Sequence, residues 1–389
     1  MSGQVTSTIP PDHRRAMKIA LVGDWFLPRL GGIELQTRDL ALELMAEGHL
    51  VEVITGVPGP DAVDGIKVIR LPGPRLIGAG IAVTPGVFKA LHGSIRAGGY
   101  DVIHAHFGII TPIAHDALRF AAAHRIPAVA TFHSVLRYYD LPLKLLDRTL
   151  GYSGWPVRYV GVSSVTAEAM RPLVGDHDIA VIPNGIDLAW WRRPAGAIRP
   201  DRAATRPVAF VTVMRLEKRK RARALIAAFA DAMTGLAAGA AELTVIGDGG
   251  ERPALERIVE RRGLSGQIRF LGSRGRPEIR DILHRSDVFA LASRLEAFGI
   301  AALEARAAGL PVVTLKASGA RDFLRHDGDS LLAGDDAELS RQIRSLIVDP
   351  ALRGRLAQGA EASPEGVDWT SVGPRYLAEY RAAIRDAAV

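Results

Sequence analysis

The sequence predicts an α/β protein made of two doubly wound domains, because short apolar β-rich runs alternate with helical patterns along most of the chain. Buried parallel strands form nearly continuous apolar runs, since helices cover both faces of their sheet. The length of 389 residues suits two domains of ordinary size, each with its own core. With no cysteine in the chain, disulfides, thiolate metal sites and cysteine nucleophiles are excluded.

The apolar runs predict strands in two groups separated by a pause. In the first half they cover 18–22, 51–55, 101–104, 128–131, 159–162 and 180–182. Helical patterns between them predict helices over 33–46, 110–124 and 165–171. After the pause the predicted strands cover 208–213, 243–246, 268–271, 288–291 and 311–314, and an amphipathic helix is predicted over 369–388.

The pause at 183–207, rich in Pro, Arg, Ala and Gly, predicts the domain boundary. We expect a disordered tail over 1–16, a first domain over 17–190 and a second over 191–368. The tail lacks the apolar core of a signal peptide, and charged residues break the longest apolar window, 225–247, so a soluble cytoplasmic protein is expected. The net charge of +7 suits a nucleic acid, an anionic membrane face or a phosphorylated ligand without choosing among them.

In doubly wound sheets, ligands bind outside the carboxyl ends of the strands, so a cleft between the domains is the expected site. Gly31 and Gly32 follow the first strand, where backbone N–H groups at a helix start can approach an anion. A tight loop with positive φ explains this pair equally well. Gly247 opens a second glycine-rich turn, but Arg252 replaces the third glycine of a dinucleotide fingerprint, which weakens an NAD-dehydrogenase interpretation.

The densest charge run, 215–221, follows the first strand of the second domain. Such a run is usually a solvated face and sometimes a nucleic-acid patch. At the carboxyl end of a strand, however, Arg215 and Lys220 would point into the cleft, where cations stabilise a diphosphate. We favour the phosphate interpretation for these two residues.

The segment 296–304 places two carboxylates around a helix start. A helix beginning at about Phe298 would offer free N–H groups to an anion, with Glu296 before it and Glu304 more than a turn beyond. This spacing suits a ligand with hydroxyls at both ends and phosphates between, which describes a sugar nucleotide. Two unrelated glutamates around a helix cap are the alternative, and the Arg215 and Lys220 pair favours the first interpretation.

The combination resembles the retaining family-four glycosyltransferases of GT-B fold, over nearly the whole chain from about Lys18. The residues that carry the resemblance are Gly31, Gly32, Arg215, Lys220, Glu296, Phe298, Gly299 and Glu304, with 183–187 and 247–249. Within the family, 104–106 and 114–118 are similar to the branch of the catalytic subunit that initiates GPI-anchor synthesis.

The resemblance implies roles for the donor-side residues. Arg215 and Lys220 would hold the donor diphosphate and stabilise its charge as it leaves. Glu296 and the backbone of Phe298 and Gly299 would hydrogen-bond the transferred sugar. Glu304 would hold the ribose hydroxyls, and Gly247 would lie in the donor-binding turn.

The resemblance also implies roles for the acceptor side. His133 matches the family's histidine near the sugar, and Gly31 and Gly32 would cover the diphosphate or admit the acceptor. The last helix, 369–389, would cross back to complete the acceptor-side first domain, while the second domain would bind the nucleotide sugar.

Three positions depart from the family pattern, in loops that lie near the donor in the family. The family often has Gly where this chain has Met214 and Arg221, and Gly-Gly-x-Pro-Glu where it has 318–322.

Three short sequence patterns could hold a metal ion, but each has a simpler interpretation. His104 and His106 alternate on a strand at a spacing that can hold Zn²⁺, but no third ligand is apparent, and we favour strand-end polar residues. The Asp-x-Asp patterns at 176–178 and 327–329 are interpreted as turns. The GT-B resemblance implies neither a metal nor a cofactor.

The resulting prediction is a retaining hexosyltransferase that moves a hexose, or an amino or modified sugar, from a UDP- or GDP-sugar to a small soluble acceptor, as in bacterial natural-product biosynthesis. One alternative is a phosphoinositide or other lipid acceptor at a membrane surface, which leaves a peripheral membrane contact open. A sugar-nucleotide epimerase is another. A nucleic-acid-binding protein is the last, and the basic run's lack of interleaved aromatics argues against a nucleic-acid partner.

Overall fold

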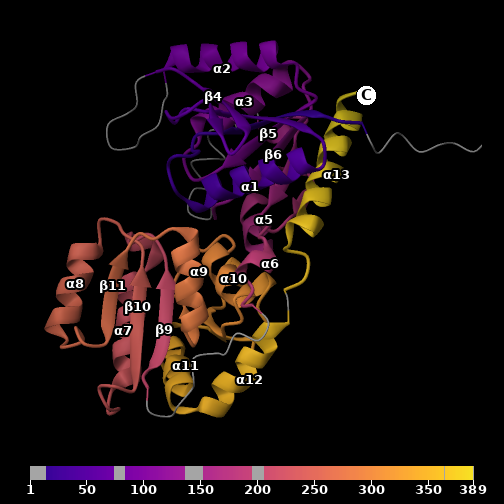
Figure 1. Cartoon of the computed structure of the whole chain (residues 1–389). Helices are drawn as coiled ribbons and strands as arrows, with labels where there is room; N and C mark the ends of the chain where they lie inside the picture. Colours follow the sequence, from indigo (N-terminus) through magenta and orange to yellow (C-terminus); the bar gives the residue numbers. More distant parts are fainter. Residues whose placement is uncertain (1–14, 74–83, 136–151, 195–205, 363, 389) are drawn as a thin grey trace, which may run out of the picture. The chain divides into compact units, whose positions relative to one another are not determined.

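The structure is a computed structural model that describes residues 15–73, 84–135, 152–194, 206–362 and 364–388. The expected tail therefore lies outside the described residues up to residue 14. By its internal contacts the chain divides into two compact units. The first comprises 1–130, 155–158 and 377–389, and the second comprises 131–154 and 159–376. Two largely parallel sheets with helices between their strands confirm the predicted α/β class (Figure 1).

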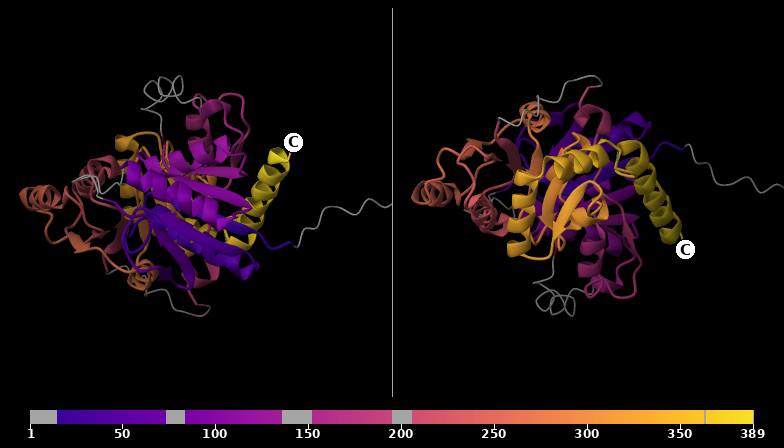
Figure 2. Two further views of the ribbon diagram at one scale, coloured as in Figure 1. Left: turned by 90° about the horizontal axis from the view of Figure 1, so that it is seen from above. Right: turned by 90° about the horizontal axis from the view of Figure 1, so that it is seen from below.

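The first sheet has eight strands in the order β3-β4-β2-β1-β5-β6-β7-β8. Its strands are β1 (Lys18–Gly23), β2 (Leu50–Thr55), β3 (Ala62–Val63), β4 (Ile66–Arg70), β5 (Val102–Phe107), β6 (Ala128–Phe132), β7 (Arg158–Gly161) and β8 (Ile179–Val181). β1 pairs in parallel with β2 and β5, whereas β3 and β4 form an antiparallel hairpin. The view from above in Figure 2 shows indigo and violet strands of this sheet side by side. Because the chain order reverses between β1 and β5, the switch point of this sheet lies there.

The helices of this half begin and end at residues suited to those positions. They are α1 (Gly32–Ala46), α2 (Pro85–Gly98), α3 (Pro112–Ala123), the short 3₁₀ helix η1 (Tyr152–Gly154), α5 (Ser164–Met170) and α6 (Leu188–Trp191). Proline opens α2 and α3, where its missing N–H has no partner to lose. Gly99 ends α2 in the left-handed region, with a φ of 58°.

The second sheet has six parallel strands in the order β11-β10-β9-β12-β13-β14. They are β9 (Val208–Val213), β10 (Ala241–Ile246), β11 (Ile268–Gly272), β12 (Val288–Ala290), β13 (Val312–Leu315) and β14 (Ser330–Ala333). Figure 1 shows β11, β10 and β9 side by side. Here the chain order reverses between β9 and β12.

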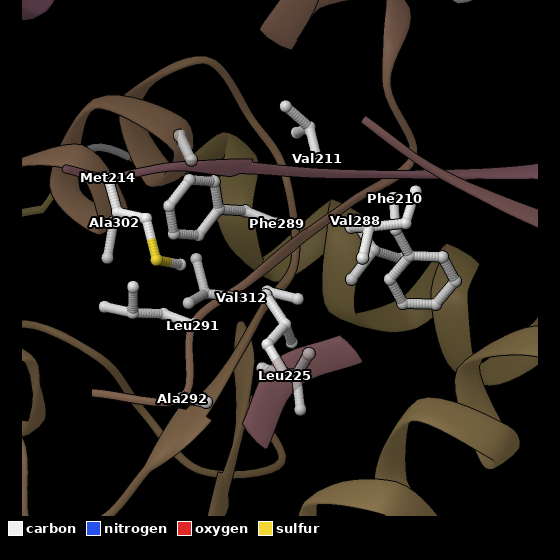
Figure 3. Close-up of a cluster of buried hydrophobic side chains, with 14 of the residues drawn as sticks. Phe210, Val211, Met214, Leu225, Val288, Phe289, Leu291, Ala292, Ala302 and Val312 are labelled. Carbon is white, nitrogen blue, oxygen red and sulfur yellow. The ribbon is translucent and has the colours of Figure 1, made fainter. Parts of the chain in front are cut away.

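Helices and short 3₁₀ turns connect these strands. They are η2 (Lys218–Lys220), α7 (Ala222–Met233), α8 (Arg252–Arg261), α9 (Arg276–Arg285), α10 (Ile300–Ala307), η3 (Gly319–Asp322), α11 (Asp336–Val348) and α12 (Pro350–Glu361). α11 packs on β13 and β14. Figure 3 shows side chains from β9, β12, β13, α7 and α10 meeting in one apolar cluster. Phe210 of β9 meets Phe229 of α7 there edge to face, with ring centroids 5.8 Å apart.

A buried ion pair holds the C-terminal turn of α10 in place. Arg306 and Asp329 are almost fully buried, with guanidinium and carboxylate 3.1 Å apart. Arg306 also donates to the carbonyls of Ala360 and Ala362 at the end of α12. Asp329, one of the Asp-x-Asp carboxylates, is therefore used inside the fold, and Asp327 has the positive φ of a turn residue.

The last helix, α13 (Trp369–Ala387), belongs to the second unit up to Tyr376 and to the first unit from Leu377 on. In the first unit, the hydroxyl of Tyr380 is 2.7 Å from Nδ1 of His104. The division between the units falls earlier in the chain than the expected boundary at 190/191. Hydrogen bonds within the second unit, such as those from Ser163 to Ala297 and from Ser164 to Asp322, tie the segment after β7 to it.

Candidate active site

Two loops meet at the switch point of the second sheet. β9 and β12 are neighbours, with Phe210 paired to Val288, so the loops that follow them leave the same edge. The first loop carries Arg215 and Lys220, and the second carries Glu296. The carboxyl edge at a switch point is where ligands bind in open α/β sheets.

Lys220 and Glu296 form an ion pair in this site. Nζ of Lys220 donates to Oε2 of Glu296 at 2.7 Å, with only 17% and 13% of the two side chains exposed. The structure thus brings together two residues that the sequence predicted for the site. Each charge holds the other in place in a region partly shielded from water.

The backbone of the two loops is joined as well. The hydroxyl of Ser293 donates to the carbonyl of Lys220 at 3.1 Å. The guanidinium of Arg221 donates to the carbonyl of Ala292 at 3.0 Å and to both carboxylate oxygens of Asp336. This contact lowers the pKa of Asp336, because the guanidinium favours the ionised carboxyl. The position of Lys220 is therefore fixed from two sides.

Arg221 has a φ of 57°, in the left-handed region that favours glycine. This explains why the family often has Gly at this position. The three hydrogen bonds of the Arg221 guanidinium offset the backbone strain. The departure from the family pattern therefore adds a tether between loops rather than removing a ligand contact.

Gly247 allows the turn after β10 to approach the loop after β9. A Cβ at Gly247 would lie 1.9 Å from the carbonyl oxygen of Met214, and its φ is 126°. Leu216 N–H donates to the carbonyl of Asp248 at 2.8 Å, joining the same two loops. Met214 is itself buried in the core, which accounts for an apolar residue where the family often has Gly.

Arg215 differs from Lys220 in its surroundings. Its guanidinium lies 3.4 Å from the carboxylate of Glu217, and about half of its side chain (49%) is exposed. Arg215 is thus a cation on the same loop that can turn toward an anion without breaking a buried pair.

The start of α10 lacks the acidic groups that would neutralise it. The helix begins at Ile300, two residues later than expected, because Gly299 has a left-handed φ of 94°. No side chain caps it and its first turn contains no acidic residue. Phe298 is buried, with its ring centroid 5.0 Å from that of Phe323, so only its backbone can meet a ligand. The uncapped N–H groups and the helix dipole favour an anion here.

Glu304 lies in the second turn of α10 and is 8% exposed. It comes two residues before Arg306, whose buried pair with Asp329 holds the helix. Glu304 therefore has little freedom to move.

His133 follows β6 and belongs to the same compact unit as Lys220 and Glu296. Burial lowers the pKa of His133 to about 4, and a hydrogen bond with the Asn184 side chain opposes this shift only in part. The imidazole is thus neutral at pH 7. Asn184, which the sequence reasoning did not assign to a site, lies in the 183–187 segment that carries the family resemblance.

Gly31 and Gly32 belong to the first unit. Gly31 is extended, with a φ of −173°, and neither residue has a positive φ, so the tight-loop explanation is wrong. A Cβ at Gly31 would lie 2.4 Å from Oε2 of Glu34, which shows that this carboxylate folds back over the glycine. Arg29 donates to Oε1 of Glu34 at 2.6 Å.

Asp24, directly after β1, is a further polar residue that the sequence reasoning missed. Its carboxylate accepts from the N–H groups of Ile113 and Ala114 at 3.1 and 3.2 Å, at the start of α3. Burial raises the pKa of Asp24 to about 7, and the two N–H bonds oppose the shift only in part. An acidic residue immediately after a buried strand was the available signal.

The histidines of β5 are buried neighbours, with the ring centroids of His104 and His106 4.1 Å apart. Within the described ranges, no group of three or more His, Cys, Asp or Glu side chains is arranged to hold a metal ion. The same ranges contain no helix that is both long and apolar enough to cross a membrane.

Two family models match successive stretches of the chain. Residues 30–190 match "Glycosyltransferase Family 4", and residues 197–363 match "Glycosyl transferases group 1". The chain belongs to the family-four glycosyltransferases of GT-B fold. This confirms the resemblance and favours glycosyl transfer over the epimerase and nucleic-acid alternatives.

Curated relatives of this glycosyltransferase differ in what their names say they act on. Glycogen synthase of Mycobacterium tuberculosis is 29% identical over 95% of each chain. A phosphatidylinositol N-acetylglucosaminyltransferase chain of Arabidopsis thaliana is 27% identical over 85% of this chain and 74% of its own. D-inositol 3-phosphate glycosyltransferase of Salinispora arenicola is 29% identical over 88% of this chain and 80% of its own.

A solved structure shares the fold. Alr3699/HepE of Anabaena, in complex with UDP and glucose, superposes with a TM-score of 0.73 at 22% identity, over 94% of this chain and 99% of that one. This likeness confirms the GT-B architecture.

Proposed function

We propose that this glycosyltransferase moves a hexose, or an amino or modified sugar, from a nucleoside-diphosphate sugar to a hydroxyl acceptor with retention of the anomeric configuration. The observation that carries the proposal is the Lys220–Glu296 pair beside the uncapped start of α10, at the switch point of the second sheet. A cation, free N–H groups and a carboxylate in one place match a phosphate joined to a sugar. The UDP in the related Anabaena structure supports a nucleotide donor.

The site residues would stabilise the departing diphosphate. As the bond between the sugar C1 and the β-phosphate oxygen breaks, negative charge grows on the diphosphate. Lys220, Arg215 and the N–H groups at the start of α10 would carry that charge in a partly buried environment. Once Lys220 turns to the phosphate, the Glu296 carboxylate would accept a hydrogen bond from a sugar hydroxyl.

Retention needs no side-chain nucleophile in this proposal. The acceptor oxygen would form its bond to C1 on the face that the diphosphate leaves, and its proton would pass to an oxygen of that diphosphate. His133, kept neutral by its lowered pKa, would line the sugar without adding charge. An NMR assignment of the anomeric carbon in the product tests this step, and inversion would refute it.

The Glu296→Gln variant tests the site. It keeps the size of the side chain and removes its charge, so turnover should fall at least about a hundredfold. Glu242→Gln is the matched control, because Glu242 lies outside the proposed site and pairs with Arg269 at 3.3 Å. Thermal-shift measurements with UDP-, GDP- and ADP-sugars select the donor first. Turnover of Glu296→Gln within twofold of wild type would contradict the assignment.

For the acceptor we propose a small soluble polyol or its phosphate, supported by the relative named for D-inositol 3-phosphate. A lipid headgroup is a second candidate, supported by the phosphatidylinositol relative and by exposed apolar side chains beyond β1 and β5. These are Leu30, 67% exposed, and Ile110, 62% exposed. Transfer to soluble inositol phosphate, measured against phosphatidylinositol vesicles, separates the two.

A further inference from the structure

Hydrogen bonds that the proposed mechanism does not use hold the segment from Glu296 to Gly299 in place. The carbonyl of Ala297 accepts a hydrogen bond from the hydroxyl of Ser163 and another from the hydroxyl of Thr166 at 3.3 Å. Ser163 is the cap of α5, is almost fully buried, and also accepts from the N–H of Thr166. Two hydroxyls at one helix start thus converge on one carbonyl.

A second connection holds the neighbouring peptide. Gly319 N–H donates to the carbonyl of Glu296 at 2.9 Å. A Cβ at Gly319 would lie 2.1 Å from the carbonyl oxygen of Ala297, so only glycine permits this approach. Asp322, three residues on, accepts from both N–H and hydroxyl of Ser164 at 2.6 Å. The 318–322 segment, which departs from the family pattern, is therefore bonded to the start of α5.

These contacts determine the direction of one N–H group. The Ala297–Phe298 peptide is trans, so its carbonyl and the N–H of Phe298 point in opposite directions. While Ser163 and Thr166 hold the carbonyl, the Phe298 N–H must point away from α5. Phe298 itself cannot turn, because its ring is buried against Phe323.

We propose that Ser163 is a positioning residue that, through the carbonyl of Ala297, aims the Phe298 N–H at the transferred sugar. This role rests on the proposed function, in which the backbone of Phe298 and Gly299 binds that sugar. Ser163 itself contacts the Ala297 backbone from the side opposite to the N–H. The diphosphate of the nucleotide would be held by Lys220, Arg215 and the N–H groups of α10 from Ile300 on, so the affinity for the nucleotide alone should depend little on Ser163.

The test compares sugar-nucleotide binding with nucleotide binding in Ser163→Ala. Calorimetry is run with UDP and UDP-glucose, and in parallel with GDP and GDP-mannose and with ADP and ADP-glucose. Affinity for the sugar nucleotide should fall about tenfold, the worth of one well-placed hydrogen bond. Affinity for the nucleotide alone should stay within about twofold, and the donor KM should rise with a fall in kcat.

Two further variants separate positioning from general loosening. Ser286→Ala removes a hydroxyl that donates to the carbonyl of Ile282 at 2.8 Å, at the end of α9. Ser286 precedes β12, whereas the 296–299 segment follows it. The ratio of nucleotide to sugar-nucleotide affinity in this variant should equal that of wild type. Thr166→Val removes the weaker bond to Ala297 and should shift the ratio in the same direction by about threefold. If Ser163→Ala does not fold, Thr166→Val decides.

The outcomes distinguish this role from the function on which it rests. The positioning role is overturned if Ser163→Ala weakens nucleotide and sugar-nucleotide binding equally, so that the ratio of the two affinities stays unchanged. If Ser163→Ala does not fold, the same result in Thr166→Val overturns it. In either case, a wild-type enzyme that binds the probes leaves the proposed function standing. A wild-type protein that binds none of the six probes overturns the proposed function, and this role with it.

Discussion

The two sheets treat their switch points in opposite ways. At the first sheet, the chain's own carboxylates occupy the helix starts: Asp24 accepts from the first N–H groups of α3, and Glu34 folds over Gly31 at the start of α1. At the second sheet, α10 begins without any acidic cap, and Lys220 stands beside it.

This difference teaches which switch point is available to an anion. A helix start attracts negative charge by its free N–H groups and its dipole. When an aspartate or glutamate of the chain already meets that demand, the site is structural and repels a further anion. We therefore expect the diphosphate of the donor at the helix start of the second sheet rather than at those of the first.

The largest expected effect comes from removing the cation of the open site. Lys220→Met should lower kcat/KM by about a hundredfold to a thousandfold, because a developing charge loses its nearest cation and Glu296 loses its partner. Lys67→Met is the control, since Lys67 pairs with Glu52 at 3.0 Å on the surface. Steady-state kinetics with the selected donor measure both. Equal losses of kcat/KM in the two variants would contradict the assignment of the anion site to the second sheet.

The occupied site should show itself in the pH dependence of stability. The pKa of Asp24 is about 7 in the folded state and near 3.8 when unfolded, so the folded state binds more protons between these values. The contribution of Asp24 to the free energy of unfolding is therefore fully present below about pH 4 and is lost as the pH rises to 7. The loss amounts to a few kcal/mol. Asp24→Asn should remove this trend from thermal melts at pH 4 to 7. Parallel melting curves for wild type and variant would contradict it.

A smaller effect is expected at the tether between the two site loops. Arg221→Ala loses the bonds to Asp336 and Ala292 and keeps the left-handed strain, which should cost about 2 kcal/mol. Arg221→Gly loses the same bonds but relieves the strain, so it should be more stable than the alanine variant by about 1 kcal/mol. Urea unfolding measures both. An alanine variant as stable as the glycine variant would mean that the backbone at this position is unstrained.

The smallest effect tests whether Gly31 and Gly32 belong to the donor site. Glu34→Gln removes the carboxylate that covers Gly31 while keeping its size. If the diphosphate binds only at the second sheet, donor affinity should change by less than about twofold. A gain of fivefold or more in calorimetry would place the diphosphate at the first sheet's helix start and would reverse the comparison.

Part of this architecture could be predicted from the sequence, for physical reasons. Strands buried on both faces leave long apolar runs, so β1, β9 and β10 were found with small errors at their ends. The proximity of Lys220 and Glu296 could be predicted because the loops that follow neighbouring parallel strands leave the same edge of the sheet. The hairpin of β3 and β4 was missed, since it is short and partly exposed.

Other features leave no trace in the residue pattern. The bond from Ser163 ends on the carbonyl of Ala297, and every residue has a carbonyl. The carboxylate of Glu34 folds back over Gly31, and the presence of two adjacent glycines in the sequence does not predict this contact. The division into compact units was hidden as well, because the bond from Ser164 to Asp322 joins residues 158 positions apart.

The close approach at Gly247 has a consequence for how the site unfolds. Met214 N–H donates to the carbonyl of Ile246, Leu216 N–H to that of Asp248, and Gly247 N–H to that of Gly272. These bonds make the loops after β9, β10 and β11 one cooperative unit, so none can open alone. A ligand that contacts any one of these loops should therefore slow amide hydrogen exchange in all three, including at amides that the ligand does not contact.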